Sequence, residues 1–275
     1  MLAFLQNTPV QTALALSASA VLLCGALGLL TLIRGQAFAG HVLADISSAG
    51  GAGSLLFNLS PLLGFLFFGL AGVGALEILQ ARHGAARDEE AGILLGAGLG
   101  ITALLLHFCL THHGANGAAQ AVMFGAMFTL PPHMLIKAWG LTIIGLLTLA
   151  IIARPLLFAS MNPDLARIAG LPVRALSLVF LLLLALGVTL AAMSIGAILS
   201  TSLLVGPAAV ALRLARTMRG AMLLVMACGL TACWGGIGLA YMSYNWLPGH
   251  TWPVSFFIVA LLLLFYLLSR VKPWP

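Results

Sequence analysis

Long apolar stretches follow one another along almost the whole chain, separated by short polar segments. They occupy residues 11–33, 62–79, 91–107, 134–152, 176–195, 196–212, 221–241 and 254–268. A transmembrane helix needs about 20 mostly apolar residues, so these stretches are long enough, or nearly so, to cross a bilayer. The pattern predicts an all-α polytopic membrane protein in which residues 1–275 form a single bundle of seven or eight transmembrane helices.

Two segments depart from this pattern. Residues 37–57 are rich in Gly and Ser and are less apolar than their neighbours. Residues 118–130 form a short apolar piece that ends at Pro131 and Pro132. This piece is too short to span comfortably, so we expect a half-helix or re-entrant helix there.

The composition supports a membrane protein and suggests an orientation. Of the 275 residues, 62% are hydrophobic and 7% are charged, whereas soluble domains carry about 25% charged residues. Basic residues gather at cytoplasmic helix ends. Eleven of the 12 Lys and Arg residues fall on one side, with Lys137 as the exception, if the N-terminus is outside and the C-terminus cytoplasmic. The arginines lie singly at these ends, so no face could follow nucleic-acid phosphates.

Signatures of an enzyme are missing from the sequence. There is no HExxH motif, no GxxxxGK[ST] motif and no Ser or Cys nucleophile with an accompanying base. Besides Asp45 and Glu77, the acidic residues fall in expected loops, mainly the charged segment 81–90. The four cysteines are scattered inside apolar stretches without a CxxC spacing, which indicates small buried side chains. We therefore expect no catalytic residues.

The most informative polar residues are His41 and Asp45. Their i, i+4 spacing places both side chains on one face of a helix. Ionisable groups inside a membrane are costly and usually face a cavity, a partner or a permeation path. An imidazole and a carboxylate suit zinc, manganese or ferrous iron. The spacing also fits a hydrogen bond between helices, or a pair that reaches water.

Two other segments carry candidate chemistry. His107, His112 and His113 either collect metal at the outer mouth or belong to a solvated loop. Residues 159–174 predict a short amphipathic helix at the cytoplasmic face, capped by 162–164 and ended by Gly170 and Pro172. Such a helix could dock another subunit or simply lie at the membrane interface.

Several motifs together resemble the permease subunits of bacterial ABC importers for zinc and manganese, along almost the whole chain. Residues 34–52, "RGQAFAGHVLADISSAGGA", resemble the family's F-x-G-D-x-L-x-H-A-x-L-x-G element. Residues 195–216 resemble its G-x-L-L-x-x-A-L-L-x-x-P-A-A-x-A element, which is the most specific match. Residues 161–176 and 235–249 resemble its cytoplasmic loop and the turn into its last span. One difference is notable: His41 occupies the family's aspartate position and Asp45 its histidine position.

The resemblance implies a homodimer in the bacterial inner membrane, with a path for a divalent metal ion on or near the dimer axis. His41 and Asp45 would bind the transported ion, zinc or manganese, with iron as a further candidate and no permanently bound cofactor. A cytosolic ATPase subunit would contact Asp164, Arg167 and Gly170 of the coupling helix. A solute-binding protein would deliver the metal from outside, and transport would proceed by alternating access.

Three other interpretations remain open at this stage. In a proton-coupled secondary metal transporter, His41 and Asp45 would relay protons, and inverted repeats would be expected. An ABC permease for a metal chelate would need a wider, less charged path. In a membrane subunit that does not transport, the pair would connect two helices.

Overall fold

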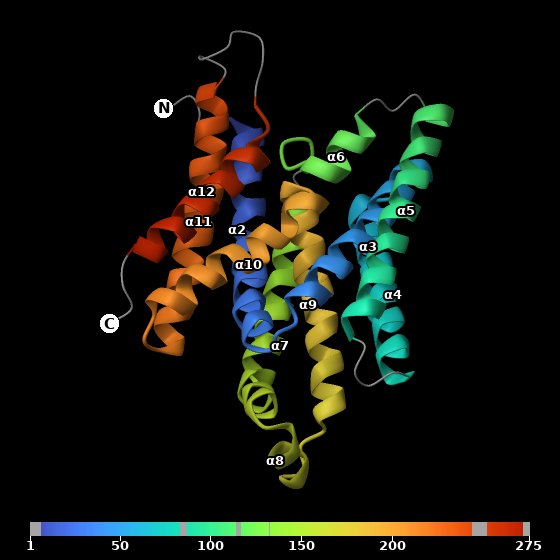
Figure 1. The fold of residues 1–275 in the computed structure, drawn as a ribbon. Helices are drawn as coiled ribbons and strands as arrows, with labels where there is room; N and C mark the ends of the chain where they lie inside the picture. The colour runs from blue at the N-terminus through green and yellow to red at the C-terminus, as the bar shows by residue number, and fades with distance from the viewer. Residues whose placement is uncertain (1–6, 83–86, 114–116, 132, 244–251, 272–275) are drawn as a thin grey trace.

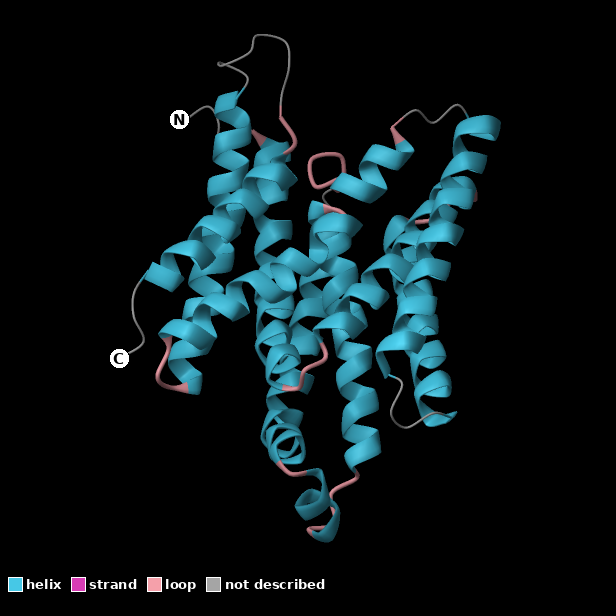
Figure 2. Ribbon diagram, in the orientation of Figure 1, coloured by secondary structure: helices cyan, strands magenta, loops and turns pink. Residues whose placement is uncertain are grey.

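The computed structural model describes residues 7–82, 87–113, 117–131, 133–243 and 252–271. Within these ranges the chain forms α-helices joined by short turns and contains no strand (Figure 2). In chain order the helices are α2 (Thr8–Ile33), α3 (Ala37–Leu56), α4 (Pro61–Arg82), α5 (Arg87–His113), α6 (Ala118–Phe124), α7 (His133–Met161), α8 (Pro163–Ile168), α9 (Val173–Ile195), α10 (Ala197–Leu214), α11 (Met218–Ser243) and α12 (Val254–Val271). The all-α fold predicted from the hydropathy pattern is confirmed.

Eight helices in the described ranges are long and apolar enough to cross a membrane: α2, α4, α5, α7, α9, α10, α11 and α12. This is the higher of the two predicted numbers. The expected loop 81–90 is shorter than predicted, because α4 continues to Arg82 and α5 begins at Arg87. Glu90, which we expected in a solvated loop, lies in the first turns of α5 and is only 8% exposed.

Helix α3 is a further long helix that apolar content alone does not identify. It spans 20 residues, and 13 of them are buried. It packs most extensively against α5 and α4, and also against α9 and α10. Figure 1 shows α3 running obliquely between the end of α2 and the start of α4. Because most of α3 is buried against other helices, it can carry Gly, Ser and Asp where a lipid-facing helix would not.

The centre of the bundle is formed by α2 and α9. Helix α2 packs against α7, α9, α10 and α11, and α9 packs against α2, α3, α4 and α7. Leu23 and Leu27 of α2 and Leu184 and Leu190 of α9 are almost completely buried. Outer helices such as α5, α7 and α12 expose many large apolar side chains, as expected of surfaces that face lipid or another apolar partner.

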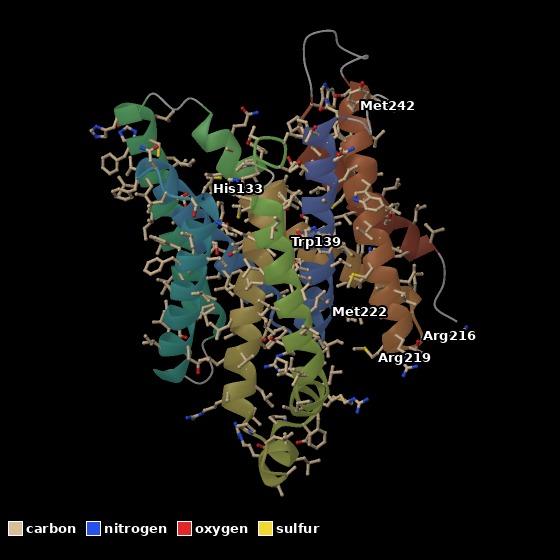
Figure 3. The ribbon with its side chains drawn as sticks, turned by 180° about the vertical axis from the view of Figure 1, so that it is seen from behind. His133, Trp139, Arg216, Arg219, Met222 and Met242 are labelled. Atoms are coloured by element: carbon tan, nitrogen blue, oxygen red, sulfur yellow. The ribbon has the colours of Figure 1, made fainter. Side chains whose placement is uncertain are left out.

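The two ends of the bundle differ in charge. Figure 1 shows α8 at one end, and the connection from α10 to α11 lies toward that end, while α6 and the start of α12 lie toward the other end. In Figure 3, Arg216 and Arg219 lie near the α8 end, and His133 and Met242 lie near the opposite end. Arg216 and Arg219, which the positive-inside rule places together with the segment around α8, therefore lie toward the α8 end.

The short segment 118–130 does not cross the bundle, as predicted. It forms the seven-residue helix α6 and then a turn that begins at Gly125. The backbone N–H of Ala126 donates to the carbonyl of Met193 (3.3 Å), which joins this turn to the end of α9. Helix α6 also packs against α3 and α10. The segment therefore lies over the helix that carries His41 and Asp45.

Candidate functional site

His41 and Asp45 lie one turn apart on the same side of α3, as their spacing predicted. Nε2 of His41 is 3.7 Å from Oδ2 of Asp45. This distance fits an ion pair but exceeds that of an ordinary hydrogen bond. The side chain of Asp45 is 4% exposed, whereas that of His41 is 38% exposed. The pair therefore has one member inside the protein and one at its surface.

Each member of the pair has a buried atom without a hydrogen-bond partner among the described residues. These atoms are Nδ1 of His41 and Oδ2 of Asp45. Buried polar atoms are nearly always hydrogen-bonded, whereas Oδ2 of Asp45 has only the 3.7 Å ion-pair contact with Nε2 of His41. A bound cation would satisfy a carboxylate oxygen in such a position. The pair therefore makes no hydrogen bond that joins α3 to a neighbouring helix through these two atoms.

The backbone around Asp45 is fixed by hydroxyl groups. Ser48 Oγ donates to the carbonyl oxygen of Asp45 (2.7 Å) and lies 2.9 Å from Thr102 Oγ1 on α5. Thr102 in turn donates to the carbonyl of Gly98 (2.8 Å). A Cβ atom on Gly98 would lie 3.2 Å from the carbonyl carbon of Asp45, so α5 contacts the α3 backbone directly. These contacts fix the backbone of α3 at Asp45 and do not involve its carboxylate.

A second hydroxyl pair attaches α3 to α9. Ser47 Oγ lies 3.4 Å from Thr189 Oγ1, and Thr189 Oγ1 lies 3.5 Å from the carbonyl oxygen of Phe65. The sequence pattern indicated that the serines extend the polar character of α3. It did not identify Thr102 or Thr189 as their partners. The only available signal was a single threonine within each apolar stretch.

The described residues contain no complete metal-ligand set. Among the described residues, no group of three or more His, Cys, Asp or Glu side chains could hold a metal ion. Zinc usually takes four ligands, and manganese takes up to six. A metal ion beside His41 and Asp45 would therefore need further ligands from outside the described residues.

The external histidines do not form a ligand cluster in the described part of the chain. His107 and His112 are exposed on α5 and lie on either side of Phe108, with ring centroids 6.2 and 6.0 Å from it. The side chain of His113 lies outside the described residues. Glu77, the other acidic residue expected within a span, is half-buried on α4.

The predicted amphipathic helix is present as α8. Asn162 Oδ1 accepts a hydrogen bond from the backbone N–H of Leu165 (3.1 Å), which caps the helix. Asp164 and Arg167 form an exposed ion pair of 3.2 Å. Gly170 has a φ of +79° and closes the helix end, as predicted. Ala166 is fully buried and Ile168 is 82% exposed, so α8 has an apolar side chain facing outward.

The family model for the ABC 3 transport family matches residues 6–272. The chain belongs to the ABC 3 transport family. The resemblance to permease subunits of metal-ion ABC importers is thereby confirmed. The match covers nearly the whole chain, including α3 and α8.

Individual relatives agree with this assignment. The chain is 26% identical over 244 residues to the manganese import system permease protein ScaB of Streptococcus parasanguinis, covering 86% of this chain and 82% of ScaB. It is 23% identical over 216 residues to the manganese transport system membrane protein MntC of Halalkalibacterium halodurans, covering 78% and 73% of the two chains. Among solved structures, PsaBC from Streptococcus pneumoniae in complex with Fab has the same fold, with a TM-score of 0.84 and 24% identity over 98% of this chain and 95% of that chain.

Proposed function

We propose that this family member is the membrane-spanning subunit of an ATP-driven importer of divalent metal ions. Manganese is the preferred candidate because the relatives ScaB and MntC are named as manganese permeases. Zinc and iron(II) are alternatives, because an imidazole and a carboxylate suit all three ions. The observation that carries the proposal is the pair of unsatisfied buried atoms, one on His41 and one on Asp45.

In this proposal, His41 and Asp45 bind the transported ion transiently. Two ligands from one chain hold an ion weakly, and weak binding allows release on the far side. A homodimer with the pair near its axis would bring four protein ligands together. That number suits zinc without added water and suits manganese with two waters.

The energy source in this proposal is a separate cytosolic ATPase subunit that docks on α8. Ile168 supplies an exposed apolar contact, and the ion pair between Asp164 and Arg167 supplies charged ones. Gly170 ends the helix and sets the direction of the chain into α9. Closure of the ATPase subunits would move α8 and exchange the inward-open and outward-open states.

The same proposal gives the orientation in the bacterial inner membrane. The arginine-bearing end with α8 faces the cytoplasm, in accordance with the positive-inside rule. The end with α6 faces outward, where a solute-binding protein would deliver the ion. The start of α2 is then outside, and the end of α12 is cytoplasmic.

Metal uptake by proteoliposomes tests the proposal. The permease is reconstituted with its ATPase partner, and uptake of manganese and zinc is measured for the parent, His41→Ala and Asp45→Ala. We expect each substitution to lower uptake at least tenfold. His107→Ala and His112→Ala serve as matched controls, because they remove exposed imidazoles, and should transport like the parent.

Two outcomes would contradict the proposal. If both site variants transport as well as the parent, His41 and Asp45 do not bind the ion. If uptake needs no ATP but follows an imposed proton gradient, the chain is a proton-coupled carrier. Uptake of a metal chelate in preference to the free ion would change the cargo but retain the ATP-driven mechanism.

A further inference from the structure

Arg34 occupies the junction between α2 and α3 and contacts two other helices. Its Nη1 donates to Ser160 Oγ and its Nη2 to Ser177 Oγ, each at 2.8 Å. Its Nε donates to Gln36 Oε1 at 3.0 Å. The guanidinium carbon also lies 5.2 Å from the ring centroid of Phe180. One side chain therefore contacts α7, α9 and the residue that precedes α3.

The two serines lie on the helices that support α8. Ser160 is in the last turn of α7, and Ser177 is near the start of α9. Helix α8 lies between α7 and α9 in the chain and packs against both of them. Figure 1 shows α8 at the far end of these two helices, beyond the rest of the bundle. Arg34 therefore joins the two helices near the base of the proposed docking helix.

The same residue is close in the chain to the proposed ion site. Helix α3 begins at Ala37, and His41 follows Arg34 by seven residues. Residues 34–36 form the turn between α2 and α3, and the helical segment from Ala37 to His41 rises about 6 Å. Gln36, which accepts a hydrogen bond from Arg34, is the residue just before α3. A movement of Arg34 would therefore be transmitted to the first turns of α3.

We propose that Arg34 is a positioning residue that transmits movement of α8 to the His41–Asp45 pair. The inference rests on the proposed function, because it assumes that α8 receives the force from the ATPase. When α7 and α9 move at the base of α8, the bonds from Arg34 to both helices carry α3 with them. The site then changes its access or its ligand geometry together with the ATPase cycle.

The chemistry of arginine suits this role. Its planar fork holds two donors in a fixed geometry, so it can join two acceptors on different helices at once. Ser160 Oγ donates to the carbonyl of Leu156, which leaves its oxygen lone pairs for Arg34. A lysine at this position has a single ammonium group on a flexible chain. It would not hold Ser160 and Ser177 in one fixed geometry.

Two independent variants test the inference. Arg34→Gln removes the fork, and the double variant Ser160→Ala with Ser177→Ala removes the acceptors but keeps the arginine. The control is Arg219→Gln, an exposed arginine on α11 at the same end of the bundle. Each variant is reconstituted with the ATPase partner, and metal uptake, ATP hydrolysis and equilibrium Mn²⁺ binding are measured.

We expect both test variants to transport at least tenfold fewer ions per ATP hydrolysed. Mn²⁺ affinity and the rate of ATP hydrolysis should stay within about twofold of the parent, and the control should match the parent throughout. Parental transport per ATP in either test variant would overturn the inference. A parallel loss of Mn²⁺ affinity would also overturn it, because Arg34 would then only support the structure of the site.

Hydrogen exchange separates this inference from the proposed function. In the parent complex, a non-hydrolysable ATP analogue should change amide exchange both in α7 to α9 and in residues 37–45 of α3. In Arg34→Gln the change in α3 should be lost. This measurement needs no metal, so it can support the link even if metal uptake itself fails. An unaltered α3 response in the variant would refute the link.

Discussion

The backbone of Gly125 crosses that of Gly196 so closely that neither position has room for a side chain. A Cβ atom on Gly196 would lie 2.1 Å from the carbonyl oxygen of Met123, and one on Gly125 would lie 2.2 Å from that of Ser194. Both glycines have positive φ values, +89° for Gly125 and +96° for Gly196. This close contact packs the turn after α6 against Gly196, the residue between α9 and α10.

The first prediction concerns this crossing. Gly196→Ala should destabilise the protein, because alanine is strained at positive φ and its methyl group overlaps a carbonyl. The expected fall in Tm is about 5 °C or more in detergent, measured by thermal unfolding. Gly238→Ala is the matched control, since a Cβ there meets no atom within 4 Å. An unchanged Tm for Gly196→Ala would contradict the close crossing.

A second prediction uses the order of the two ligands. The double variant His41→Asp with Asp45→His gives the Asp-then-His order of the family element that residues 34–52 resemble. It keeps both side chains on one face of α3. We expect it to retain metal uptake within about tenfold of the parent, with altered preference between manganese and zinc, because the carboxylate moves to the more exposed position. The double variant His41→Ala with Asp45→Ala should lose uptake.

Competition between the two metals in proteoliposomes provides the measurement for the swapped variant. If its uptake is as low as that of the double alanine variant, the site depends on the present order and not only on the two ligand types. The shared face of α3 would then be insufficient to explain binding.

The sequence predicted the apolar helices well because burial in lipid and burial in protein both require apolar side chains. It did not define α3 as a full helix of the bundle, because α3 is rich in Gly and Ser and lies among other helices. The charged segment 81–90 predicts a loop that includes Glu90, because charged side chains favour water, but Glu90 is buried. Its burial depends on how α5 packs, which the local sequence does not encode.

The candidate site, like the fold, could be predicted from the sequence only in part. The spacing of His41 and Asp45 was sufficient to predict their shared face, because helix geometry fixes it. The hydroxyl partner Thr102 was not predicted, since it lies 54 residues from Ser48 in the chain. The sequence does not predict the contacts of Arg34 with Ser160 and Ser177, because these serines are 126 and 143 residues away. Contacts of this kind depend on tertiary packing.

A third prediction concerns docking of the ATPase on α8. Ile168→Glu places a charge on an exposed apolar contact and should reduce association with the ATPase subunit at least tenfold, without changing Tm, because Ile168 is 82% exposed. Co-purification from detergent and titration of the purified partners measure this. Met218→Glu, at the start of α11, is the matched control. Equal association of the two variants would argue against α8 as the docking element.

The last prediction tests whether two copies share one ion site. Parent and Asp45→Ala chains with different affinity tags are co-expressed, and mixed dimers are isolated by two sequential purifications. One chain offers only two of the ligands that the ion needs, so a shared site should lose most of its affinity when either copy lacks Asp45. We therefore expect mixed dimers to transport at less than about one tenth of the parental rate. Two independent sites would instead leave about half of the rate, and that result would exclude a site on the dimer axis.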